Sequence, residues 1–249
     1  MHPQPTVVQE FTAELVGTFI LVFAGCGAVM VNALSGGAVT HVGVALTFGA
    51  VVAAMIYCFG HVSGCHINPA VSLAFWVAGV FPTRKVPLYL AAQVAGATAA
   101  AATLKWSLGD IANLGATLPL AHNWQQSFIL EIALAFILML VVCGSGLDQR
   151  SPKGFAGVAI GLAVFANVLV IGPVTGAGMN PARSFGPALI GQNWEHHWLY
   201  WVAPTVGTLL AVAIYRIVGP GAFRRTAHPI ETMPHDARQR AHEREALGV

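Results

Sequence analysis

Six long runs of apolar residues, separated by short polar segments, dominate the pattern of the chain. The runs cover residues 11–34, 42–60, 86–104, 127–147, 155–171 and 197–218. Each is close to the ~20 apolar residues that a helix needs to cross a lipid bilayer. The pattern therefore predicts an all-α membrane protein with six transmembrane helices.

Two further apolar runs are too short to span a membrane. Residues 69–78, which precede Gly79, and residues 181–190, which precede Gly191, contain ten residues each. At ~1.5 Å per residue each helix would be about 15 Å long, which is half of a hydrocarbon core of about 30 Å. We expect two half-helices that enter the membrane from opposite sides and meet near its middle.

Both short runs begin with the same tripeptide, Asn68-Pro69-Ala70 and Asn180-Pro181-Ala182. Proline suits the first turn of a helix because its missing N–H costs nothing there, and asparagine is a favoured cap. The glycine-containing segments just upstream are predicted to be extended loops. Since lipid cannot satisfy their carbonyls, we expect them to line a wet pore. The candidate pore-lining carbonyls are those of Gly64, Cys65, His66, Ala177, Gly178 and Met179.

The two halves of the chain resemble each other in order and spacing. Residues 13–21 align with 130–138, the tripeptides align at an offset of 112, and Tyr89 and Gly96 align with Tyr200 and Gly207. We expect a single channel domain, 1–249, that contains a first repeat, 9–115, and a second repeat, 125–219. An odd number of spans per repeat inverts the second copy, which is a plan of channels and transporters.

Composition excludes a soluble globular protein. Hydrophobic residues make up 56% of the chain and charged residues 9%, against about 25% charged in soluble domains. Of the twelve Lys and Arg residues, ten lie in the 84–85 turn, in the 150–153 turn or from Arg216 onward. Positive loops remain in the cytoplasm, so both termini are expected there. The polar segment 220–249 is expected to be a disordered cytoplasmic tail.

At these motifs the chain resembles the major intrinsic protein family, the aquaporins and glycerol facilitators, over roughly residues 9–219. The resemblance rests on segments 61–71 and 178–187, which carry the paired tripeptides and the arginine that follows the second one, Arg183. It implies a homotetramer in which each subunit holds its own pore. It places the protein in the cell membrane, plasma or inner, as a multi-pass protein.

Two acidic residues, Glu14 and Glu131, lie at matching places in the first span of each half. An ionisable group within a span is costly and by default functional, and a proton or cation path is one interpretation. The family resemblance implies another, in which each carboxylate accepts hydrogen bonds from loop N–H groups and braces the half-helix loop. We favour bracing, because no other acid lies within the predicted spans to extend a relay.

The resemblance also implies that side chains at four positions form the narrowest point of the pore. By spacing they map to Phe48, Val168, Ala177 and Arg183. Strict water channels usually carry His at the position of Val168, and glycerol facilitators carry Trp and a second aromatic residue in this region. The Val and Ala pair resembles the plant nodulin-like branch, which is associated with glycerol and metalloid hydroxides but has Trp at the first position.

Other positions resemble the water-channel pattern, namely Ser184, Ala188 and the Tyr200-Trp201 pair. We therefore expect a passive channel for water that also passes small neutral solutes and excludes ions and protons. A glycerol or metalloid-hydroxide facilitator is the alternative. Water, small neutral solutes and membrane lipid are the expected partners, with no cofactor, metal or nucleic acid.

Two other classes of protein fit less well. An ion-coupled transporter also uses inverted repeats and broken helices, but it needs a titratable pair at the substrate site. The residues expected at the midplane are Asn, Pro and Ala, with Arg183 nearby. An intramembrane enzyme is disfavoured because no Ser/His or two-acid pairing is indicated at the pore.

Overall fold

The computed structural model describes residues 4–152, 154–219, 221 and 223, and every regular element within them is a helix. The long helices are α1 (Val7–Leu34), α2 (Thr40–Ser63), α4 (Val86–Leu108), α5 (Trp124–Val142), α6 (Ala156–Thr175) and α8 (Leu199–Val218). Six helical segments are long and apolar enough to cross a bilayer. The predicted all-α fold with six spans is therefore confirmed. The expected tail, 220–249, lies outside the described residues apart from Gly221 and Phe223.

Two short helices follow the tripeptides. Helix α3 is Pro69–Ala78, as the sequence predicts, and Gly79 ends it with a left-handed φ of 82°. Helix α7 is Pro181–Gly191, one residue longer than expected. Gly191 remains helical because Gln192, with a φ of 56°, takes the left-handed position and donates its N–H to the Ala188 carbonyl.

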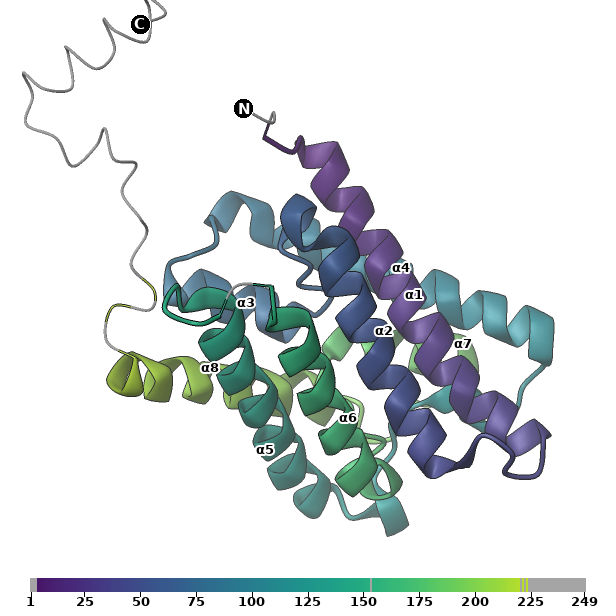
Figure 1. Cartoon of the computed structure of the whole chain (residues 1–249). Helices are drawn as coiled ribbons and strands as arrows, with labels where there is room; N and C mark the ends of the chain where they lie inside the picture. The colour runs from purple at the N-terminus through teal and green to yellow at the C-terminus, as the bar shows by residue number, and fades with distance from the viewer. Residues whose placement is uncertain (1–3, 153, 220, 222, 224–249) are drawn as a thin grey trace, which may run out of the picture.

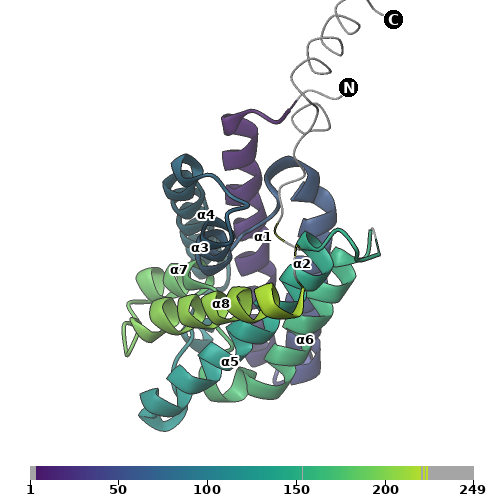
Figure 2. The ribbon, with the colours of Figure 1, turned by 90° about the vertical axis from the view of Figure 1, so that its left-hand side faces the viewer.

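The helices of the two halves pack in the same way. Helix α1 contacts α2 and α4, and correspondingly α5 contacts α6 and α8, while α2 and α6 join the halves (Figure 1). Each half-helix also contacts the last long helix of the other half, α3 with α8 and α7 with α4. In Figure 2, α3 and α7 lie close to each other beside α4, and both half-helices contact that helix. The arrangement places the two tripeptides inside the bundle.

Glycines allow the closest helix contacts. A Cβ atom on Gly96 of α4 would lie 2.2 Å from the Leu15 carbonyl oxygen of α1. A Cβ atom on Gly207 of α8 would lie 2.3 Å from the Ile132 carbonyl oxygen of α5. Small residues let helix backbones approach closely in lipid, where no hydrophobic force drives helices together. Any side chain at these two aligned positions would separate the helix pairs.

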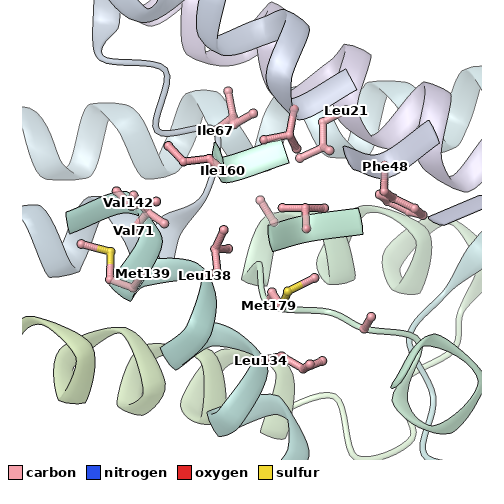
Figure 3. Packing of buried hydrophobic residues seen from close by; sticks show 14 of the residues in the cluster. Leu21, Phe48, Ile67, Val71, Leu134, Leu138, Met139, Val142, Ile160 and Met179 are labelled. Carbon is pink, nitrogen blue, oxygen red and sulfur yellow. The ribbon is translucent and has the colours of Figure 1, made fainter. Parts of the chain in front are cut away.

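Buried apolar side chains form one cluster around the half-helix loops. Figure 3 shows part of it, including Leu21, Phe48, Ile67, Val71 and Met179. These residues come from α1, α2, α3 and both loops that precede the half-helices. Large apolar side chains also cover the outside of the bundle, as lipid requires. Apolar packing thus supports the loops on the side that faces the long helices.

Candidate channel and selectivity site

The loops before α3 and α7 share an unusual backbone. Three residues in each have a positive φ: 82°, 49° and 42° at Gly64, Cys65 and Ile67, and 80°, 43° and 52° at Gly176, Ala177 and Met179. A non-glycine residue in this region costs about 1–3 kcal/mol and persists only when its surroundings enforce it. The enforcing contacts come from two buried carboxylates.

Glu14 of α1 is fully buried and holds the first loop. Its Oε1 accepts hydrogen bonds from the Ser63 hydroxyl (2.7 Å) and the His66 backbone N–H (2.8 Å). Its Oε2 accepts from the Ile67 N–H (2.7 Å) and the Gln93 side-chain amide (2.7 Å). All four partners donate to the carboxylate, so the N–H groups of two loop residues, one of them the strained Ile67, have a partner without water.

Glu131 of α5 is also fully buried and holds the second loop in the same way. Its Oε1 accepts from the Thr175 hydroxyl (2.6 Å) and the Gly178 N–H (2.8 Å), and its Oε2 accepts from the Met179 N–H (2.7 Å). Hydrogen bonds to an ionised acceptor are among the stronger ones in proteins. The two loops therefore have equivalent supports on equivalent helices.

Two buried tyrosines complete these supports. The Tyr89 hydroxyl donates to the Ser63 carbonyl (2.8 Å), and the Tyr200 hydroxyl donates to the Thr175 carbonyl (2.7 Å). Sequence alignment of the two halves pairs these tyrosines but does not show what they contact. In both halves the tyrosine binds the last residue of the long helix that precedes the loop.

The asparagine of each tripeptide caps its own half-helix. Asn68 Oδ1 accepts from the Ala70 N–H (2.9 Å), and Asn180 Oδ1 accepts from the N–H groups of Ala182 (3.0 Å) and Arg183 (3.2 Å). The prolines that follow, Pro69 and Pro181, occupy the first helical position and are buried. Since the amide oxygen is used by the cap, the amide nitrogen must face away from the helix.

The two amide nitrogens cross to the opposite loop. Asn68 Nδ2 donates to the Met179 carbonyl (3.0 Å), and Asn180 Nδ2 donates to the Ile67 carbonyl (2.7 Å). The sequence placed the Met179 carbonyl on the pore wall, and the structure shows it bonded to Asn68. Ile67 was not among the expected carbonyls. The repeat offset of 112 pairs Ile67 with the selected Met179, so the sequence did contain a signal for it.

A cavity of about 330 Å³ runs past both loops. Its wall includes all six loop residues that the sequence selected, together with Ile67, Asn68 and Asn180. Apolar side chains from the long helices form much of the remaining wall: Leu21, Val52, Ile56, Leu138, Val142, Ile160 and Val164. The wall of the cavity is therefore mostly apolar, and the half-helix loops contribute polar groups to it.

Arg183 lies on the cavity wall and is 3% exposed. Its Nη1 donates to the Gly115 carbonyl (2.8 Å), its Nη2 lies 3.5 Å from the Gly176 carbonyl, and its guanidinium carbon is 5.1 Å from the centre of the Phe48 ring. Such a cation near an aromatic face is attracted to the ring. Phe48 and Ala177 also line the cavity, whereas the buried Val168 is not one of its lining residues.

Gly115 is a partner of Arg183 that the sequence did not reveal. It ends a short turn in which Ala112, Asn113 and Leu114 have positive φ values of 48°, 49° and 56°. Leu114 is fully buried, so its side chain anchors the turn. Asn113 is a residue type that can adopt left-handed backbone, but Ala112 and Leu114 are not, so the sequence gives no clear signal for this turn.

A metal centre is not indicated by the described part of the chain. Among residues 4–152 and 154–219, the His, Cys, Asp and Glu side chains form no group of three that could hold a metal ion. The four cysteines are free thiols, with Cys58 exposed and Cys26, Cys65 and Cys143 buried. The polar residues on the cavity wall are His66, Asn68, Asn180 and Arg183, and Cys65 adds a thiol.

The fold and this cavity define a membrane channel with two half-helices that meet inside a six-helix bundle. A family model described as "Major intrinsic protein" matches residues 2–215. The chain belongs to the major intrinsic protein family.

Individual relatives agree with this assignment. The chain is 45% identical over 212 residues to Aquaporin NIP1-1 of Oryza sativa subsp. japonica, which covers 85% of this chain and 74% of the relative. It is 42% identical over 212 residues to Nodulin-26 of Glycine max, and the match covers 85% of this chain and 78% of that protein. An X-ray structure of the aquaglyceroporin from Plasmodium falciparum is similar with a TM-score of 0.79 and 25% identity, and covers 87% of this chain and 99% of that one.

Proposed function

We propose that the protein is a passive channel for water that also passes small neutral solutes and excludes ions and protons. The main support for this proposal is the pair of asparagine side chains, Asn68 and Asn180, whose amides each donate to the opposite loop. A side-chain NH₂ group has two hydrogens, and each asparagine uses one of them on the opposite loop. Both residues line the cavity, so the second hydrogen of each can bind the oxygen of a passing molecule.

Charge exclusion follows from three positive features at the same place. The N-termini of α3 and α7 bear partial positive charge, and both begin at the cavity. Arg183 adds a full positive charge that deprotonation cannot remove. Glu14 and Glu131 brace the loops in this proposal, since their hydrogen bonds go to loop donors and neighbouring side chains.

Solute size is proposed to be set by Phe48, Val168, Ala177 and Arg183. Val168 and Ala177 are small and apolar, which leaves room and offers no side-chain donor. These two residues favour a second candidate function, a glycerol or metalloid-hydroxide facilitator. The similarity to Nodulin-26 and to a solved aquaglyceroporin agrees with that candidate.

The remaining organisation is proposed from the symmetry of the contacts. Residues 9–115 and 125–219 act as inverted repeats, because their loops, bracing carboxylates and asparagine caps correspond in position. The ends of the bundle near Arg84 and Arg150 face the cytoplasm, with both termini. Exposed apolar side chains such as Leu46 and Leu162 offer outer surface for a homotetramer, which native mass spectrometry in mild detergent would detect. A monomer alone under non-dissociating conditions would contradict it.

Reconstitution of the purified protein into lipid vesicles tests the main proposal. Stopped-flow light scattering would measure volume changes in water, glycerol and urea gradients, with protein-free vesicles as the control. An internal pH dye would measure proton leak in the same preparation. We expect faster water flow than in the control without added proton leak. Water permeability equal to that of protein-free vesicles would overturn the proposal.

A further inference from the structure

Helix α6 lacks one backbone hydrogen bond close to the proposed selectivity region. Pro173 lies inside this helix and has no N–H to donate to the carbonyl of Leu169, four residues earlier. Leu169 directly follows Val168. A carbonyl that is left without a partner in a membrane is costly, so another donor is needed.

His41 of α2 supplies that donor. Its Nε2 lies 2.8 Å from the Leu169 carbonyl oxygen, although the residues are 128 positions apart. A carbonyl oxygen can only accept, so Nε2 must carry the hydrogen. The bond therefore assigns the ring tautomer, and it persists whether or not Nδ1 is also protonated.

Gly172 makes room for this ring. A Cβ atom at Gly172 would lie 3.0 Å from His41 Cε1 and 3.5 Å from Val168 Cγ1. The imidazole, the glycine and the Val168 side chain therefore meet in one packed group. A side chain at position 172 would press on the ring and would fill the space between it and Val168.

The position of His41 on α2 connects this group to Phe48. The two residues are seven positions apart on one helix, which places them two turns apart on the same face. Further along the same pair of helices, Gly49 and Gly161 bring α2 and α6 into close contact. The His41 bond is thus a second tie between α2, which carries Phe48, and α6, which carries Val168.

We propose that His41 is a positioning residue of the selectivity region. Its hydrogen bond to the Leu169 carbonyl replaces the one that Pro173 removes, and it holds the turn that bears Val168 at a fixed distance from Phe48. This inference rests on the proposed solute channel. According to this inference, a residue at the start of α2 helps to determine which neutral solutes can pass.

The substitution His41→Phe tests it by keeping a ring and removing the donor. A loosened turn should let larger solutes pass more easily, so the ratio of glycerol to water permeability should rise about fivefold, the effect of losing one ordinary hydrogen bond. His41→Gln keeps an N–H donor on a shorter side chain and should retain a ratio near that of the parent. An unchanged ratio in correctly assembled His41→Phe would overturn the inference.

Pro173→Ala provides a rescue that a general loss of stability would not show. An alanine N–H can bond to the Leu169 carbonyl within the helix, and residue 173 is exposed. The double variant His41→Phe/Pro173→Ala should therefore recover the parental ratio. If His41→Phe does not assemble, the double variant decides: assembly with the parental ratio supports the inference, and failure to assemble or an altered ratio overturns it.

Hydrogen exchange separates this inference from the proposed function. Residues 169–175 of the parent should exchange slowly and those of His41→Phe faster, whatever the vesicles transport. A parent that conducts no water would overturn the proposed function, even with this exchange difference. A conducting parent with equal exchange in both proteins would overturn only the role of His41.

Discussion

The side-chain nitrogen of Asn180 lies 2.7 Å from the backbone carbonyl oxygen of Ile67, 113 positions earlier in the chain. The reciprocal bond joins Asn68 to the Met179 carbonyl at 3.0 Å. Each half-helix is thus capped by its own asparagine and tied by that same side chain to the other loop. The centre of the channel is one unit, in which neither half is complete alone.

Asn180→Asp should damage this unit with little change in shape. A carboxylate can still cap α7 but has no N–H for the Ile67 carbonyl, and its negative charge favours cations. We expect water permeability to fall about fivefold and a sodium leak to appear in flux assays. Asn123→Asp is the matched control, since Asn123 is an exposed cap at the start of α5. Equal behaviour of the two variants would contradict the role of Asn180.

Arg183→Val should keep water flow but admit ions or protons, because the positive charge on the cavity wall is removed. Arg84→Val removes the same charge from an exposed turn and serves as the control. The measurement is the rate of proton and potassium leak into vesicles with matched protein content. If folded Arg183→Val leaks no more than Arg84→Val, another group excludes charge.

Val168→His combined with Ala177→Thr should reduce glycerol permeability at least about tenfold more than water permeability, because bulk and donors are added at two positions of the proposed selectivity region. Val170→His is the control, because it adds the same ring on the exposed side of α6, where Val170 is 69% exposed. It should change neither the glycerol nor the water permeability. Stopped-flow measurements in glycerol gradients would show the difference. An equal reduction of both permeabilities, or a parent that passes no glycerol, would show that the mapping of these positions is wrong.

Cys65→Ala should protect water flow from a membrane-permeant mercurial. Cys65 lies on the cavity wall and is 6% exposed, so a bound mercurial would obstruct the passage. Cys26 and Cys143 are fully buried, and Cys58→Ala controls for the exposed thiol. Water permeability is compared before and after the reagent in the parent and both variants. Equal inhibition of the parent and Cys65→Ala would place the sensitive thiol elsewhere.

Asp148 should stabilise the turn between α5 and α6 except at very low pH. Hydrogen bonds from the Arg150 side chain and backbone, and from the Tyr215 hydroxyl, hold the pKa of this carboxyl well below its ordinary value. A lowered pKa means that the stabilisation is present above the ordinary pKa and is lost as the pH falls toward the lowered one.

The melting temperatures of the parent and Asp148→Asn test this dependence. The difference in melting temperature between the two proteins should be constant from about pH 8 to about pH 5, and it should disappear only in stronger acid. Asp110→Asn removes an exposed partner of Lys105 and should show a smaller gap throughout. A gap for Asp148→Asn that closes near neutral pH would contradict the assignment.

Sequence reasoning succeeded where short-range signals decide the structure. Asn68, Pro69 and Gly79 bound α3 because cap, first-turn and left-handed preferences all act within a few residues. The end of α7 was missed by one residue, because Gln192 adopts a positive φ that its residue type does not predict.

Long-range partners could not be predicted in the same way. Gly115 binds Arg183 across 68 positions, and Gln93 binds Glu14 across 79 positions. A polar residue such as Gln93 within an apolar run is a signal that it has a buried partner, but it does not say which. The repeat offers no help there, since the aligned position in the second half, 204, is proline.

The crossed amide bonds can form only after the ribosome has synthesised both halves of the chain. Asn68 reaches the membrane well before Met179, which follows it by 111 positions. At about 5–20 residues per second the ribosome needs roughly 6–20 s to produce the missing partner. Until then, Asn68 lacks the carbonyl that its amide binds in the folded channel. Closure of the pore is a late event of biogenesis rather than a property of each newly inserted helix.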